Sequence, residues 1–246
     1  MMATAAHGET VQPAAQNCRF TTIGTATVRA VTDDGVLLDD GRTLRLDGVA
    51  DVSGSELRAS LPAGASIVLK RLGATPETDR YGRIVAHVFR TEDAAETWVQ
   101  ADLIARGYAL LGPRLGDTAC ARELQLREQS ARSAKLGLWA EAYYVISKAD
   151  SPAEVLKRRG RFALVEGKVI SVRESGGTIY VNFGRRWSED FTVTVAKRNE
   201  RAFVAAGMEP KKLAGRQVRI RGWIEERGGP WVEASRPEQI EVVERN

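Results

Sequence analysis

A polar turn that leads into a strand holds residues whose side chains can bind anions. The run Thr78–Phe89 reads TDRYGRIVAHVF, in which Tyr81, Gly82 and Arg83 end the turn and an alternating segment follows. Another arginine, Arg45, lies in an earlier alternating segment. Guanidinium groups bind phosphate oxygens in a bidentate manner. Cleavage of a phosphodiester would also need an activated water and balance for the developing negative charge. A strand arginine can equally be exposed or paired with an acid, so both roles stay open.

Aromatic and basic residues interleave in the C-terminal half. Arg185, Arg186 and Trp187 are consecutive in an expected loop, where a large aromatic is hard to explain as core. Proteins bind single-stranded nucleic acid by stacking bases on aromatic rings beside a basic groove. The neighbouring Tyr180 and Phe191 could instead fill the interior of a small barrel.

The composition is that of a soluble globular protein of 246 residues, with 43% apolar and 28% charged residues. This length accommodates two domains of ordinary size. No apolar run approaches the roughly 18–20 residues of a membrane-spanning helix. The net charge of +4 permits binding to polyanions without demanding it. Residues 1–149 hold 17 Lys/Arg against 18 Asp/Glu, whereas residues 160–246 hold 16 against 12, so the second half is the better candidate for a basic surface.

Two cysteines and two histidines do not have the spacing of a zinc site. The even cysteine count favours a disulfide between Cys18 and Cys120, which would tie an N-terminal arm to a helix in an oxidising compartment. The alternative is two unrelated thiols. His87 alternates with apolar residues on the expected strand, and no catalytic partner is in sight, so we interpret it as a structural or surface residue.

The first half predicts a five-stranded barrel. Asp-Gly pairs between short apolar runs indicate hairpin turns, because both residues tolerate positive φ. The order of three strands, a helix and two strands is that of an OB-type barrel, and two helices follow. The strands are expected at Ala26–Val31, Val36–Leu38, Thr43–Val49, Ser66–Arg71 and Arg83–Phe89, the intervening helix at Gly54–Leu61, and the final helices near 96–106 and 118–136.

The second half repeats this order of elements, so the fold class is α+β, mainly β, with two OB-type barrels. The strands are expected at Arg161–Val172, Thr178–Phe183, Phe191–Val195, Gln217–Glu225, Trp231–Ala234 and Gln239–Val243, with helices at Glu200–Gly207 and Pro210–Leu213. The predicted organisation is a flexible arm at 1–19, a first domain at 20–140, a linker at 141–159 and a second domain at 160–246.

The run 78–89, together with the helix expected after it, resembles the core of the thermonuclease (micrococcal nuclease-like) family over about residues 20–140. The resemblance implies that Arg45 and Arg83 bind the phosphate that is cleaved. It implies that Arg80 and Tyr81 contact the nucleotide, and that Asp34 is a ligand of a calcium ion, a hard cation that takes oxygen ligands.

The family pattern is broken after Arg45. The positions of the second metal carboxylate and of the general base are Ala50 and Ser53 here. Asp51 could still offer an oxygen to a metal, and Glu56 lies close by, but neither residue belongs to the family pattern.

Three functional hypotheses follow. In the first, the protein has weakened or lost catalysis and binds nucleic acid or another anion through Arg45 and Arg83. In the second, Asp34 and Asp51 hold a divalent metal and the protein is an active calcium-dependent phosphodiesterase on single-stranded DNA or RNA. In the third, two barrels present surfaces to a protein partner in the cell envelope, since OB-type barrels host many functions.

The compartment follows from the resemblance and the cysteines. Many members of the family are exported, which implies a periplasmic or secreted location. Residues 1–17 contain neither the basic nor the apolar region of an intact signal peptide as written.

Overall fold

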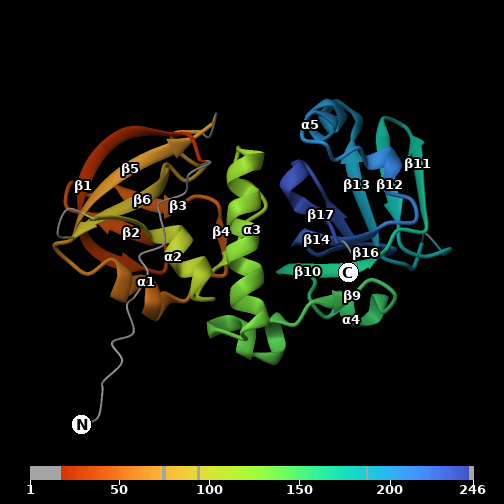
Figure 1. Cartoon of the computed structure of the whole chain (residues 1–246), viewed down its shortest axis with the longest axis horizontal. Coiled ribbons are helices and arrows are strands. Elements are labelled where there is room, and N and C mark those ends of the chain that lie inside the picture. Colours follow the sequence, from red (N-terminus) through yellow and green to blue (C-terminus); the bar gives the residue numbers. More distant parts are fainter. Residues whose placement is uncertain (1–17, 74–75, 93–94, 187, 244–246) are drawn as a thin grey trace, which may run out of the picture.

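The structure is a computed structural model that describes residues 18–73, 76–92, 95–186 and 188–243. Two β-barrels flank a long helix, α3 (Figure 1). The first part contains β1 (Phe20–Thr32), β2 (Gly35–Leu38), β3 (Thr43–Leu46), β4 (Val49–Ala50), α1 (Gly54–Ser60), β5 (Ser66–Leu72), β6 (Ile84–Glu92), β7 (Ala95–Trp98), α2 (Val99–Ala105), β8 (Leu110–Leu111) and α3 (Thr118–Ser133). Short 3₁₀ helices at Gly137–Ala140 and Ala142–Tyr144, the strand β9 (Ser147–Lys148) and α4 (Pro152–Leu156) lead to the second barrel.

The first barrel closes because β3 pairs with β6. The sheet runs β3-β2-β1-β5-β6-β7, and the additional parallel pairing of β3 with β6 closes its first five strands into a ring that β7 extends. This is the strand arrangement of an OB-type barrel. Alternate residues of β2 and β3 are buried, as expected for strands with one face toward a core. Val28, Leu38, Leu44 and Ile67 lie in this core.

The second barrel has the same connections, although two of its strands are interrupted. It is built from β10 (Phe162–Lys168), β11 (Ser171–Ser175), β12 (Thr178–Asn182), β13 (Thr192–Ala196), α5 (Glu200–Ala205), β14 (Gln217–Trp223), β15 (Glu225–Arg227), β16 (Gly229–Glu233) and β17 (Ile240–Val242), with 3₁₀ turns at Lys197–Asn199, Pro210–Lys212 and Pro237–Gln239. The β10 strand pairs with β14, β11 with β12, β12 with β13, β13 in parallel with β16, and β15 with β16. The α+β fold, with an OB-type barrel in the first half, is therefore confirmed.

Several elements differ from the sequence-based expectation. The strand β3 ends at Leu46, and the strands expected at Arg161–Val172 and Gln217–Glu225 are each divided in two. The start of one expected helix is a strand. Residues 96–98, expected at the start of a helix, belong to β7, which pairs antiparallel with β6. Trp98 lies opposite Phe89, and their rings stack with centroids 6.0 Å apart. A cross-strand aromatic pair stabilises a sheet edge more than the weak helix preference of these residues opposes it. The helix α2 therefore starts only at Val99.

The disulfide between Cys18 and Cys120 is present. Their Cα atoms lie 4.7 Å apart, within the range that a disulfide spans. Cys120 is in the first turn of α3, where its backbone N–H donates to Asp117, the N-cap residue. The bond therefore fastens the chain just before β1 to the start of α3. Within the described residues, no helix is both long and apolar enough to cross a bilayer.

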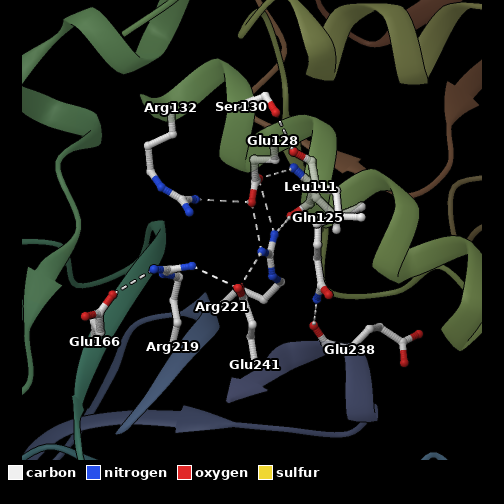
Figure 2. A network of polar contacts seen from close by, with 11 residues as sticks. Leu111, Gln125, Glu128, Ser130, Arg132, Glu166, Arg219, Arg221, Glu238 and Glu241 are labelled. Carbon is white, nitrogen blue, oxygen red and sulfur yellow. Dashed lines mark hydrogen bonds and ion pairs between the residues drawn. The ribbon is translucent and has the colours of Figure 1, made fainter. Parts of the chain in front are cut away.

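The outer face of α3 and the neighbouring loops hold the two barrels together. Leu110, Ala131 and Trp139 pack with Phe162 and Leu164 of β10 in one buried apolar cluster. Beside it lies a network of charged groups (Figure 2). At its centre, Arg221 of β14 contacts Glu128 of α3. The interface thus contains both apolar packing and buried ion pairs, and it positions residues of the second barrel next to the first.

Candidate anion-binding cleft

Two parallel strands place Arg45 beside Arg83. Arg45 lies in β3, directly opposite Val85 of β6. Arg83 immediately precedes β6. Residues about 40 positions apart in the sequence therefore meet at one end of the barrel. Their side chains are 40% and 26% exposed, so both guanidinium groups can be reached from solvent.

The turn before β6 is built around the carboxylate of Asp79. Its Oδ1 accepts the backbone N–H groups of Tyr81 and Arg83 at 2.9 and 3.1 Å. Gly82 has φ +75°, which glycine adopts at little cost. Tyr81 is consequently presented outward and is 67% exposed. The guanidinium of Arg80 lies over the Tyr81 ring, 4.7 Å from its centroid, and donates to its hydroxyl at 2.6 Å.

Asp79 also joins the two arginines. Arg83 donates from Nε to Asp79 Oδ2 at 2.8 Å, its Nη2 lies 2.8 Å from the same oxygen, and its Nη1 donates to the carbonyl of Asp34. Arg45 Nε lies 3.6 Å from Asp79 Oδ2, and Arg45 Nη2 lies 3.7 Å from Asp47 Oδ1. The looser contacts of Arg45 leave its N–H groups free to turn toward a ligand. Arg83 is held more rigidly, with two of its five N–H donors left over.

The charge of Asp79 is stabilised in this position. Partial burial works to raise the pKa of the carboxyl, but the hydrogen bonds from Arg83 and from the backbone outweigh it, so the pKa is lowered. Asp79 therefore stays ionised and orients the two guanidinium groups, as a positioning group does at a site for phosphate.

These residues line a cleft of about 670 Å³ that is shared between the barrels. Arg114, in the loop after β8, and Arg236, before the last 3₁₀ turn, add exposed guanidinium groups. Neither side chain forms an ion pair with another residue of the described segments. In all, five arginines and two aspartates line the cleft, so its charge favours an anionic ligand.

The sequence analysis did not identify Arg114, Trp223 or Arg236. Trp223 ends β14, lines the cleft and is 55% exposed. A signal for it exists in the sequence: alternation along β14 buries Val218 and Ile220 and places Trp223 on the opposite face. A tryptophan on the polar face of an alternating strand indicates an interface or a ligand contact.

The residues present do not fit the calcium ion that the family resemblance implies. Asp34 is exposed and borders Arg83, whose Nη1 lies 2.8 Å from its carbonyl oxygen. Across the described segments, no group of three or more His, Cys, Asp or Glu side chains is placed to hold a metal. Calcium takes six to eight oxygen ligands, of which several are carboxylates in most protein sites. A lone exposed carboxylate does not provide them.

Asp51 lies at the domain junction and does not line the cleft. Its burial raises the pKa of the carboxyl, an effect that the nearby Arg161 of the second half opposes. Ala50, where the family resemblance implied the second metal carboxylate, pairs with Leu110 and packs against the apolar cluster between the barrels. A carboxylate there would be buried among apolar side chains, so the docking of the second barrel explains an alanine at this position.

Ser53, where the resemblance implied the general base, also makes a structural contact. Ser53 is the residue before α1, and its N–H donates to the carbonyl of Tyr108 at 2.8 Å. Glu56 lies in the first turn of α1, where its negative charge interacts favourably with the positive end of the helix dipole. Neither side chain lines the cleft.

The second candidate region lies elsewhere. Arg185 and Arg186 are exposed in the loop between β12 and β13, and Arg186 pairs with Glu189 at 2.9 Å. Trp187 falls outside the described residues. Phe183 and Phe191 are buried in the core of the second barrel, with ring centroids 5.0 Å apart. The structure does not bring this loop to the cleft that contains Arg45 and Arg83.

His87 is fully buried, as suits a structural residue. Its ring contacts those of Phe20 and Trp98 edge to face, and neither ring nitrogen has a hydrogen-bond partner in the described part of the chain. Asp47 Oδ2 lies 4.0 Å from Nε2, beyond hydrogen-bond reach. Burial therefore dominates and lowers the pKa of His87 to about 3.

Comparison with known proteins identifies one part of the chain. Residues 60–141 match the family described as staphylococcal nuclease homologues. The matched segment includes Arg80, Tyr81 and Arg83 but begins after Arg45. No curated protein matches the chain. Residues 60–141 therefore belong to a staphylococcal nuclease-like domain.

Proposed function

We propose that this protein binds single-stranded nucleic acid or related phosphate anions through Arg45 and Arg83, and that its catalysis is weakened or lost. The observation that supports binding is the convergence of both guanidinium groups on Asp79 within one accessible, predominantly cationic cleft. Paired guanidinium groups can hold a phosphate in a bidentate manner. The exposed ring of Tyr81 lies beside them, where a base could stack.

The residues around the cleft support the loss of catalysis. The positions of the second metal carboxylate and of the general base are Ala50 and Ser53, and both have structural contacts of their own. Removal of a single general base or of one charge-stabilising group typically lowers the rate by about 10²- to 10⁴-fold. Two such losses at once leave binding as the function that the cleft can still perform.

The test separates binding from cleavage. The affinity of the full chain for a single-stranded oligonucleotide is measured by fluorescence anisotropy over a range of salt concentrations. We expect binding that weakens steeply with salt, because phosphate contacts release counterions. Arg45→Ala and Arg83→Ala should each weaken it. Arg29→Ala, at an exposed arginine of β1 away from the cleft, is the matched control.

Phosphodiesterase activity on the same strand, with calcium present, tests the catalytic part. Turnover near about 10 per second, typical of enzymes, that disappears in Arg83→Ala would contradict the loss of catalysis. Absence of any binding at low salt would contradict the whole proposal and favour a protein-interaction module.

We also propose that the protein is exported to the periplasm or secreted. The disulfide between Cys18 and Cys120 supports this, because such bonds persist in oxidising compartments. Cell fractionation with thiol alkylation, followed by non-reducing mass spectrometry, tests it. Recovery in the cytoplasmic fraction with two free thiols would contradict the proposal.

A further inference from the structure

We infer that the second barrel supplies part of the same binding site: Trp223 is a stacking platform for a base, and Arg236 contacts the backbone of a single strand that also occupies Arg45 and Arg83. This inference rests on the proposed function, because it extends the ligand from the first barrel across the junction. It concerns residues outside the segment that matches the nuclease homologues.

Trp223 is exposed at the cleft although its neighbours on the same face of β14 are not. The outward row of β14 comprises Arg219, Arg221 and Trp223. Arg221 is completely buried against α3, whereas Trp223, two residues further along the same face, emerges into the cleft with 55% of its surface exposed. Leaving so much indole surface in water forgoes apolar burial. A tryptophan at the rim of a cationic cleft is therefore better explained by a ligand than by packing.

Trp223 is also held in place. Phe162 of β10 lies directly opposite in the strand register, and the two rings meet edge to face with centroids 6.2 Å apart. Phe162 itself is buried in the apolar cluster between the barrels. A ring supported from one side needs little ordering when a base stacks on it, so less free energy is lost on binding.

The two barrels keep a defined relation across the cleft. The carboxylate of Glu238 accepts the backbone N–H groups of Leu115 and Gly116 at 3.3 and 3.2 Å. This contact joins the loop that contains Arg114 to the segment that contains Arg236. Together with the buried pair of Arg221 and Glu128, it sets the position of the second-barrel side chains relative to Arg45 and Arg83.

The cleft also limits the chemistry of the ligand. One phosphate cannot contact five arginines on two barrels, so the charge indicates a ligand with several anionic groups. The exposed rings of Tyr81 and Trp223 indicate that it also has flat faces. Backbone phosphates with bases that can leave the stack satisfy both conditions. An acidic peptide satisfies only the first, and a duplex hides its bases.

The experiment compares three probes on the full chain: an oligothymidylate of about ten nucleotides, within the site sizes of single-strand binders, an abasic phosphodiester of the same length, and inorganic pyrophosphate. Trp223→Leu keeps an apolar contact with Phe162 but has no aromatic face. We expect this substitution to lower the affinity for oligothymidylate roughly 5- to 150-fold, the range for loss of one stacked base. Affinity for the abasic strand and pyrophosphate should stay within about twofold. Trp223→Phe should restore most of the loss.

Arg236→Ala is tested through the salt dependence, which a purely structural role would not change. Removal of one phosphate contact to a single strand should reduce the slope of log K against log salt by about 0.7. Arg29→Ala, which removes the same charge from an exposed position that does not line the cleft, should leave the slope unchanged. Circular dichroism and thermal unfolding verify that each variant is folded.

The outcomes distinguish the inference from the proposed function. In one outcome, Arg83→Ala weakens the binding of all three probes, but Trp223→Leu lowers the affinities for oligothymidylate and for the abasic strand equally or not at all. The inference is then wrong and the proposed function stands. If Arg45→Ala and Arg83→Ala change no probe, the proposed function is wrong as well. Tight binding of a polyglutamate peptide, with no preference for base-containing strands, would show that the cleft binds an acidic protein and not a nucleic acid.

Discussion

Arg221 of β14 and Glu128 of α3 form a buried ion pair that joins the two barrels. Arg221 Nη2 lies 2.8 Å from Glu128 Oε2, and the side chains are 2% and 1% exposed. Two further hydrogen bonds support the pair: Arg221 Nη1 donates to the carbonyl of Leu111, and Glu128 Oε1 accepts the N–H of the same residue (Figure 2). This single contact connects the strand that ends in Trp223 to the helix fastened by the disulfide.

Removal of one member of this pair should lower the stability of the fold. Arg221→Met leaves the carboxylate of Glu128 buried without its main partner, and we expect a loss of about 3–5 kcal/mol in the free energy of unfolding. Urea denaturation measures it. Arg221→Met combined with Glu128→Met removes both charges of the pair. It should recover part of that loss, because the charged neighbours of the pair lose only longer contacts. Arg132 lies 3.8 Å from Glu128, and Glu241 lies 3.9 Å from Arg221.

The exposed pair of Lys157 and Glu154 is the matched control for this prediction. Its side chains are 69% and 63% exposed, so Lys157→Met should change the free energy of unfolding by at most about 1 kcal/mol. Equal effects at Arg221 and Lys157 would show that the buried pair does not hold the barrels together.

His87 should make the protein less stable in acid. Its pKa falls from 6.5 to about 3 on folding because burial disfavours the charged ring. Between these values the unfolded chain binds more protons than the folded one. The free energy of unfolding therefore decreases as the pH falls from about 6.5 to about 3. The expected slope is at most about 1.4 kcal/mol per pH unit.

The variant His87→Phe isolates this effect. The difference in the free energy of unfolding between wild type and variant should vary with pH from about 6.5 down to about 3 and should be constant above that range. Parallel profiles for the two proteins throughout the range would contradict the burial of a neutral ring.

Loss of the disulfide should destabilise the first barrel. The bond joins residues 102 positions apart in the sequence. The double variant Cys18→Ala, Cys120→Ala lacks it, and its free energy of unfolding should be lower by about 2–5 kcal/mol. Thermal unfolding with and without a thiol reductant measures it. The reductant should lower the melting temperature of the wild type and leave that of the variant unchanged; equal sensitivity in both would show that the bond contributes nothing.

Asp51→Asn should be tolerated and should leave function intact. Asp51 has φ +42°, which asparagine also adopts, and burial raises the pKa of its carboxyl. The ionised group is therefore disfavoured in the folded state, so the substitution should raise the free energy of unfolding at pH 7, by less than about 1 kcal/mol after screening. The gain should shrink as the pH falls toward the ordinary pKa of an aspartate, because the carboxyl is then protonated in the folded state.

The same variant tests the metal-dependent alternative. If Asp51 were a ligand, Asp51→Asn would weaken any calcium-dependent cleavage, and Asp34→Asn would do the same. Divalent-metal dependence that responds to both substitutions would restore the phosphodiesterase hypothesis.

Local sequence was sufficient for the order of the elements and for one half of the cleft. Alternating burial and Asp-Gly turns identify the barrel strands, because side chains alternate between faces and these turns require positive φ. The polar turn that presents Tyr81 and Arg83 is formed by contacts within five residues around Asp79, so it too could be inferred from the sequence. The start of β7 was missed, since its pairing with β6 depends on aromatic contacts across the sheet.

Only the tertiary structure decided which residues share the cleft. Arg45 reaches Asp79 because β3 and β6 pair in parallel, and Asp51 is separated from both because it faces the domain junction. Trp223 and Arg236 join the cleft through docking of the second barrel. Alternation in a strand shows which face is apolar, but a polar face looks the same whether it meets water, as at Trp223, or a second domain, as at Arg221. That choice depends on contacts between residues about 90 positions apart, which no local pattern records.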